Sequence, residues 1–196
     1  MTPLRALAIR LGCVALAIFL AGISATSATD LKLGEDVLDA IVKLRAEVPS
    51  DARSAETLGT EREGSGVLID ADGLVVTIGY LIMEASRVEI ETSDGRTVPA
   101  NIVAYDYDSG FGLVRAQTPL KLKPMALGQS RTLKERTPVV AASYGGAESA
   151  IGAYVVSRRT FAGYWEYLME DAIFTAPAHP QFGGSRAPPA GGRRRS

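Results

Sequence analysis

The feature that most constrains the fold of this chain is a run of short apolar segments joined by Asp-Gly turns within Gly64–Leu113. The segments VLID and LVVTI flank Asp72-Gly73, and the segments VEIET and TVPANIVAYD flank Asp94-Gly95. Asp-Gly between β-prone segments is a strong signal for a tight hairpin turn. One more strand is expected at FGLVRA (Phe111–Ala116), so successive hairpins predict an antiparallel barrel or sandwich.

The segment before these hairpins predicts one further barrel strand and a loop. LGEDVLDA has acidic residues in its first turn and is typical of a short helix. Ala40–Val48 is rich in β-branched residues and suits the first barrel strand. Pro49–Glu63 is polar and carries Pro and Gly, which predicts an exposed loop. We therefore expect an N-terminal strand and loop in residues 29–63 and the first barrel core in 64–116.

The remaining chain predicts a connection followed by more strands. Residues 117–136 lack strand alternation and are expected to connect two barrels. Two strands are predicted at Thr137–Tyr144 and Ser149–Phe161, around a Gly-Gly turn. Tyr164–Ala178 is expected to form one more strand pair, with a short helix at Glu166–Glu170 as the alternative. A partial second barrel in residues 137–184 and a disordered basic tail in residues 185–196 complete the expected organisation.

The N-terminus has the three-part pattern of a secretory signal peptide. Two arginines without an acid precede an apolar run, and a small polar segment follows. The run is short for a membrane span, which needs about 20 residues. We predict a leader over residues 1–28, cleaved after Ala28 or alternatively after Ala25, with a retained anchor as the rival interpretation. The single cysteine, Cys13, lies inside this leader, so the mature chain would carry no thiol and no membrane segment.

Composition excludes several classes of function. The formal net charge is −1, with 46% hydrophobic and 22% charged residues, as in an ordinary globular domain. This balance does not favour nucleic acid as a partner. One histidine and scattered carboxylates give no ligand spacing for a metal site, and no cofactor motif is present. Glu89 and Glu91 share one strand face and are interpreted as solvated surface residues.

The motifs together resemble the trypsin-like serine proteases of the HtrA/DegP type. The phrases that carry the resemblance are GSGVLIDADGLVVTIGYLIMEASRVEIETSDGR, YDYDSGFGLV, PMALGQSRTLKER, TPVVAASY and, more weakly, HPQFGGS. The resemblance implies an all-β, trypsin-like double β-barrel, with the second barrel truncated at its C-terminal end. It also implies an exported protein of a bacterial periplasm.

The same resemblance indicates that the catalytic groups are replaced. Tyr80 stands where the family places its histidine, Gly110 where it places its aspartate, and Phe182 where it places its serine. Pro180 stands at an oxyanion-hole position and has no N–H to donate. Tyrosine is a poor base at neutral pH, glycine has no orienting group, and phenylalanine has no nucleophile. We therefore expect no catalytic residues in this chain.

Displaced groups offer only weak substitutes. Asp106 and Asp108 lie near Gly110, and Asp108 would share its face on a strand, but both are better interpreted as turn residues. His179 with Ser185 would be a makeshift dyad, whereas the simpler interpretation of His179 is a solvent-exposed loop histidine.

Three functional hypotheses follow. The first is a pseudoprotease that binds unfolded or extended polypeptides by strand addition. The alternatives are an active periplasmic serine endopeptidase and a decayed gene product without selected function. The sequence does not indicate an oligomeric state.

Overall fold

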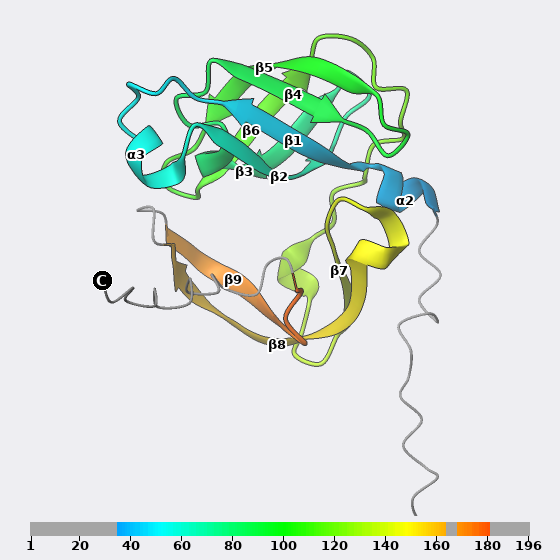
Figure 1. Ribbon diagram of the computed structural model, residues 1–196. Helices are drawn as coiled ribbons and strands as arrows, with labels where there is room; N and C mark the ends of the chain where they lie inside the picture. Colours follow the sequence, from blue (N-terminus) through cyan, green and yellow to red (C-terminus); the bar gives the residue numbers. More distant parts are fainter. Residues whose placement is uncertain (1–34, 164–167, 181–196) are drawn as a thin grey trace, which may run out of the picture. The chain divides into compact units, whose positions relative to one another are not determined.

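The computed structural model describes residues 35–163 and 168–180, all within one compact unit, Leu33–Ser196. Strands dominate the described chain (Figure 1). In order, its elements are α2 (Glu35–Asp39), β1 (Ile41–Glu47), α3 (Ala55–Leu58), β2 (Glu61–Leu68), β3 (Leu74–Ile78), η2 (Gly79–Leu81), β4 (Arg87–Glu91), β5 (Thr97–Tyr105), β6 (Phe111–Ala116), η3 (Ser130–Thr132), β7 (Pro138–Ala142), η4 (Gly146–Ser149), β8 (Ala150–Ala162) and β9 (Leu168–Ala176). The predicted all-β class is confirmed.

Six strands close into an antiparallel barrel in the order β1-β2-β3-β6-β5-β4. Closure is made by β4, which pairs with β1 from Lys43 opposite Glu91 to Glu47 opposite Arg87. A closed barrel leaves no free strand edge within itself, so its backbone groups pair around the whole ring. The hairpin pattern of the sequence therefore predicted the architecture of this part of the chain.

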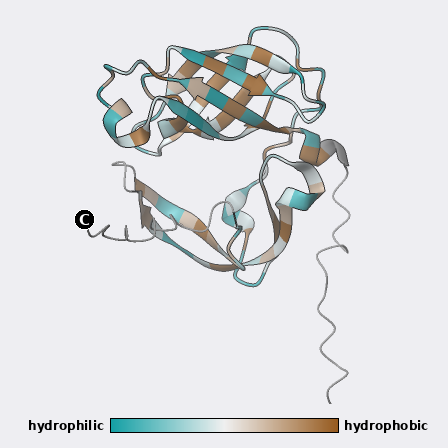
Figure 2. Ribbon diagram, in the orientation of Figure 1, coloured by the Kyte–Doolittle hydropathy of each residue, from teal (hydrophilic) through white to brown (hydrophobic). Residues whose placement is uncertain are grey.

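The barrel core is built from the residues that alternate inward along each strand. Val42 and Leu44 of β1, Val75 of β3, Ile90 of β4 and Val114 of β6 are at most 1% exposed. Figure 2 shows the matching alternation of hydrophobic and hydrophilic residues along these strands. Because successive side chains of a strand point to opposite faces, one face of each strand fills the barrel and the other faces outward.

The two Asp-Gly turns form as expected. Gly73 and Gly95 have φ angles of 80° and 81°, in the left-handed region that glycine adopts without steric cost. The Gly95 N–H donates to the Thr92 carbonyl at 2.9 Å, and the Gly73 N–H donates to the Asp70 carbonyl at 3.4 Å. These turns fix the register of the hairpins that they join.

The predicted exposed loop at Pro49–Glu63 is wrong in its second half. Ala55–Leu58 forms the short helix α3, and β2 begins at Glu61 instead of after Gly64. Within β2, Arg62 is only 4% exposed. A charged residue on the inward side hides the apolar alternation that normally identifies a strand, which is why the polar sequence EREG resembled a loop.

The strands after the barrel form a separate open sheet in the order β7-β8-β9. The strands predicted at Thr137–Tyr144 and Ser149–Phe161 are confirmed as β7 and β8. Where a strand pair or a helix through Glu166–Glu170 was predicted, the described residues form the single strand β9, which pairs with β8 over most of its length. The helix prediction is wrong from Leu168 onward, because Leu168 lies opposite Ala162 in the sheet.

Several predicted segments lie outside the described residues, namely the leader (1–28), residues 164–167 and the basic tail (185–196). Within the described chain, no helix is both long and apolar enough to cross a membrane. In the same part of the chain, the second sheet has three strands, with β7 and β9 at its two edges.

Candidate functional site

Tyr80 lies in the turn η2, which directly follows β3 at one end of the barrel. Its side chain is half-buried and packs against the hydrophobic core. Its carbonyl accepts a hydrogen bond from Nη1 of Arg62 at 2.7 Å, and the same nitrogen donates to the Met83 carbonyl at 2.9 Å. The turn that presents Tyr80 is therefore anchored by a buried guanidinium.

Gly110 lies beside this turn. The N–H of Gly79 donates to the Gly110 carbonyl at 2.7 Å, so the residues before Tyr80 and at 110 are in direct contact. Gly79 permits close packing here, since an added Cβ would lie 2.2 Å from the ring of Tyr105. Gly110 has a φ of 74°, which favours glycine.

The aspartates before Gly110 lie in the turn between β5 and β6. Residues 106–109 form a turn between β5 and β6, and Asp106 accepts hydrogen bonds from the Ser109 hydroxyl and from the Asp108 N–H at 3.1 Å. The Ser109 hydroxyl is the main cause that lowers the pKa of Asp106, followed by the Asp108 N–H. The turn interpretation of Asp106 and Asp108 is confirmed, and Asp108 does not share a strand face with Gly110.

His179 is buried, so its interpretation as a solvent-exposed loop histidine is wrong. The residue is 6% exposed, and its Nε2 lies 2.9 Å from the carbonyl oxygen of Ser149. Because a carbonyl only accepts, this contact requires a hydrogen on Nε2. The Ser149 carbonyl accepts the Nε2–H of His179 in place of water, which explains how this polar ring can be buried. Pro180 follows in a turn, and Phe182 and Ser185 lie outside the described residues.

An apolar pocket of about 310 Å³ lies beside Tyr80 on the outer face of β1, β2 and β3. Its apolar wall is formed mainly by Ile41, Val67, Val76, Ile78, Leu81 and Phe111. Tyr80 and Ser65 also line it, together with Ala142 from the end of β7. The pocket lining is therefore mostly hydrocarbon, with the hydroxyl-bearing residues Tyr80, Ser65 and Thr77, and it includes no charged residue and no histidine.

Tyr144, which sequence reasoning missed, connects the β7–β8 loop to the barrel. Its N–H donates to Oγ of Ser65 at 3.1 Å, and its hydroxyl donates to Oε1 of Glu91 at 3.0 Å. Burial raises the pKa of Tyr144, and the hydrogen bond to the Glu91 carboxylate raises it further. Gly145 and Gly146 signalled a turn after this residue, but no local pattern indicated its long-range contacts.

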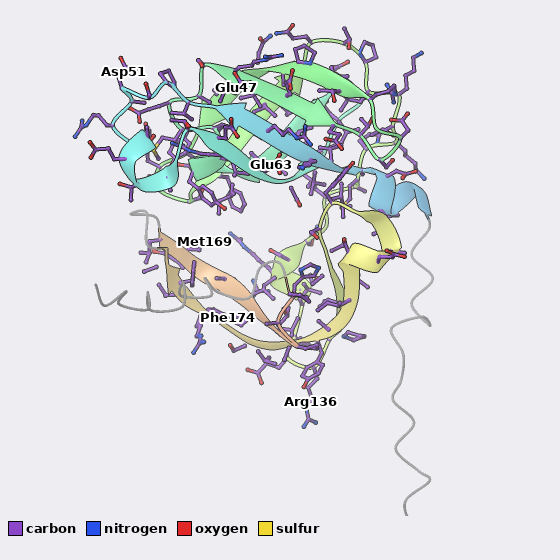
Figure 3. All side chains as sticks on the ribbon, viewed as in Figure 1. Glu47, Asp51, Glu63, Arg136, Met169 and Phe174 are labelled. Atoms are coloured by element: carbon purple, nitrogen blue, oxygen red, sulfur yellow. The ribbon has the colours of Figure 1, made fainter. Side chains whose placement is uncertain are left out.

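The outward face of β1, β2 and β4 carries alternating charges. Lys43 pairs with Glu63 at 2.8 Å, and Arg45 pairs with Glu91 at 3.0 Å. Figure 3 labels Glu47 and Glu63, two carboxylates of this face. Exposed ion pairs of this kind contribute about 0–1 kcal/mol each, so the face is interpreted as a solvated surface. In residues 35–163 and 168–180, no cluster of three or more acidic, histidine or cysteine side chains is arranged to hold a metal ion.

Comparison with known proteins gives relatives of one kind. Residues 64–188 match the family described as "Trypsin-like peptidase domain". The chain is 32% identical over 121 residues to the serine protease PepD of Mycobacterium tuberculosis, covering 56% of this chain and 26% of that protein. It is 38% identical over 72 residues to the periplasmic serine endoprotease DegP of Escherichia coli, covering 36% of this chain and 15% of that protein.

A solved structure, "HtrA-type protease AlgW with tripeptide", shares the fold. The TM-score is 0.55 at 19% identity, over 71% of this chain and 44% of that one. The chain thus spans about a quarter of PepD and less than half of this protease.

Proposed function

Because the chain belongs to the family of trypsin-like peptidase domains, we propose that it is a catalytically inactive member, a pseudoprotease. The observation that carries the proposal is the contact between the turns of Tyr80 and Gly110, joined by the 2.7 Å hydrogen bond from Gly79. The frame brings together two positions that the resemblance assigns to a histidine and an aspartate. One holds a phenol in place of an imidazole, and the other holds no side chain.

The remaining positions support the same conclusion. Acyl transfer needs a nucleophile activated by a base, and donors for the oxyanion. By the resemblance, Phe182 stands at the nucleophile, where its side chain cannot attack, and Pro180 stands at a donor position, where its backbone has no N–H. The Nε2 of His179 does not act as a base, since it carries a hydrogen that is directed to the Ser149 carbonyl. The four changes, at Tyr80, Gly110, Phe182 and Pro180, are independent, so a shift of one alignment position would not restore the chemistry.

Binding of an extended polypeptide is the function that this arrangement retains. Strand addition uses backbone N–H and C=O groups at a sheet edge and needs no catalytic group. Among the described residues, β7 and β9 are the edge strands of the second sheet. DegP is named a periplasmic protein, and the predicted leader supports export of this chain to the same compartment.

The test follows an unfolded, fluorescently labelled protein incubated with the chain. Fragment release and light scattering are recorded in the same tube, with an active HtrA-type protease as the positive control. We expect no fragments and reduced scattering, as strand addition to the unfolded protein would compete with its aggregation. The decisive variants are Tyr80→Phe and Phe182→Ala, which leave an inactive chain unchanged in the fragment assay.

Two outcomes would favour the alternatives. Fragments that persist through purification, and that disappear in Tyr80→Phe or Phe182→Ala, would identify an active endopeptidase. Neither fragments nor reduced scattering would indicate a product without this binding function.

A further inference from the structure

We propose that Asp72-Gly73 is a site of covalent modification, where the aspartate converts to isoaspartate through a succinimide, and that the fold protects the chemically identical pair Asp94-Gly95. Both pairs lie in tight turns of the closed barrel, the first between β2 and β3 and the second between β4 and β5. The inference concerns the covalent stability of the chain and is independent of the proposed function.

The step needs only the two residues and water. The backbone nitrogen of Gly73 attacks Cγ of the protonated Asp72 carboxyl and forms a C–N bond. The hydroxyl of that carboxyl leaves as water, together with the hydrogen of the nitrogen. Water then opens the five-membered ring at the former backbone carbonyl, which becomes a carboxylate, and the main chain now runs through Cβ and Cγ with one more methylene. Glycine favours the attack, because it has no Cβ to hinder the approach of its nitrogen.

The carboxylate of Asp94 is held in place by its neighbours in the turn. Its Oδ1 accepts from the Thr92 hydroxyl and from the Arg96 N–H at 3.4 Å, and its Oδ2 accepts from Nε of Arg96 at 2.7 Å. The N–H of Gly95, whose nitrogen would attack, donates to the Thr92 carbonyl at 2.9 Å. This turn therefore restrains both the carboxyl and the nitrogen that the reaction must bring together.

The same contacts keep the Asp94 carboxyl ionised. The Thr92 hydroxyl, followed by the Arg96 side chain, lowers the pKa of Asp94 from 3.8 to about 2. The protonated form, which is the one that loses water, is therefore more than about tenfold rarer at mildly acidic pH than it is for an ordinary aspartate. Charge and geometry thus act in the same direction at this turn.

The Asp72 side chain has none of these restraints. It is exposed, and within the described part of the chain no hydrogen bond or ion pair holds its carboxylate. Arg115 donates from Nη1 to the backbone carbonyl of Asp72 at 3.2 Å, and the same nitrogen lies 3.6 Å from Oδ2 of Asp70. The Gly73 N–H makes only a long hydrogen bond, of 3.4 Å, to the Asp70 carbonyl. Gly73 is buried, but the attack is intramolecular and begins with rotation of the exposed Asp72 side chain.

The test incubates the folded full chain at mildly acidic pH and then maps isoaspartate in its tryptic peptides. Cleavage after arginine separates the two sites, because residues 63–87 contain Asp72 and residues 88–96 contain Asp94. Electron-transfer fragmentation in a mass spectrometer distinguishes isoaspartate from aspartate at each position. Since the protonated carboxyl is the reacting form, we expect isoaspartate at position 72 to exceed that at position 94 by more than about tenfold.

Three controls separate the effect of the fold from the chemistry of the Asp-Gly pair. Incubation in urea removes both turns, so the excess at position 72 should disappear. Thr92→Val removes the hydroxyl that holds Asp94 and should raise isoaspartate at position 94 in the folded chain, with Arg96→Gln as the second variant if Thr92→Val fails to fold. Asp72→Glu keeps the charge but cannot close the five-membered ring, so it should give no isoaspartate at position 72.

Three results would overturn the assignment. The first is equal isoaspartate at the two positions of the folded chain, or an excess at position 94. The second is a folded chain that forms isoaspartate at neither position over a time in which the chain in urea forms it at both, because the fold would then protect both turns. The third is no rise at position 94 in a folded Thr92→Val or Arg96→Gln chain, which would refute protection by the contacts of Asp94.

Discussion

Replacement of Arg62 by methionine tests how the turn that carries Tyr80 is held. Arg62 is 4% exposed and uses all three of its guanidinium nitrogens. Nε donates to the Gly59 carbonyl at 3.2 Å, Nη1 to the carbonyls of Tyr80 and Met83 at 2.7 and 2.9 Å, and Nη2 to Oγ of Ser54 at 2.8 Å. One side chain therefore joins the loop before β2 to the turn after β3.

The expected loss follows from these contacts. A buried carbonyl left without a donor costs about 1–3 kcal/mol. Of the three carbonyls that accept from Arg62, those of Tyr80 and Met83 belong to half-buried residues, and that of Gly59 belongs to an exposed one. Removing the guanidinium also relieves its own desolvation, which is the main cause that lowers the pKa of Arg62, and offsets part of that loss. We expect Arg62→Met to lower the free energy of unfolding by about 2–4 kcal/mol. Arg62→Lys keeps the charge but loses the planar guanidinium, so its free energy of unfolding should lie between those of the wild-type chain and of Arg62→Met.

The assay is urea unfolding monitored by circular dichroism. Arg45→Met is the matched control, because Arg45 is on the neighbouring strand with a side chain 48% exposed and makes only surface ion pairs. Its loss should stay below about 1 kcal/mol. An Arg62→Met protein as stable as the Arg45→Met protein would refute the role given to these hydrogen bonds.

Three further predictions concern single residues. The Thr92 hydroxyl is the main cause that lowers the pKa of Asp94 from 3.8 to about 2. The stability that Asp94 contributes is thus present above pH 3.8 and is lost as the pH falls through 2. An NMR titration of Asp94 should give a midpoint near 2, and Thr92→Val should raise that midpoint. Tyr144→Phe should cost about 1 kcal/mol in urea unfolding through the lost hydrogen bond to Glu91. The pKa of Tyr144 is raised above 10. The stability that Tyr144 contributes is therefore full below pH 10 and is lost as the pH rises through the raised pKa. Absorbance titration of the wild-type chain should show a late-titrating phenol that the Tyr144→Phe chain lacks. Gly110→Ala should cost about 1–2 kcal/mol, since its φ of 74° is unfavourable for a residue with a Cβ; an unchanged unfolding midpoint would contradict this.

The barrel could be predicted from sequence because its signals are local. Asp-Gly turns and two-residue alternation are visible within a few positions, and both formed as predicted at Gly73 and Gly95. The errors occurred where a polar residue is buried with distant partners. Arg62 depends on carbonyls 18 and 21 residues away, and His179 depends on a carbonyl 30 residues away. No window of neighbouring residues contains that information, so both were assigned to exposed loops.

The sequence named candidate site positions but not their contacts. The resemblance assigned Tyr80 and Gly110 to two site positions, and the structure adds that a hydrogen bond from Gly79 to Gly110 joins the two turns. The pocket wall was missed, because it combines outward residues of β1, β2 and β3 with Ala142 from far along the chain. Outward apolar residues on a half-buried strand look the same in sequence whether they line a pocket or face water.

In this barrel, the residues that build the core and the candidate site positions lie in different parts of the structure. The buried core consists of inward-facing strand residues such as Val42, Val75 and Val114, whereas Tyr80 and Gly110 lie in turns between strands. Substitutions in these turns leave the inward alternation of the strand residues unchanged, although the Tyr80 side chain itself packs against the core. At Gly110 the backbone itself favours glycine over any residue with a Cβ. Family membership therefore predicts the barrel of this chain better than it predicts catalysis, since catalysis depends on a few side chains at particular positions and the barrel depends on the alternation of many residues.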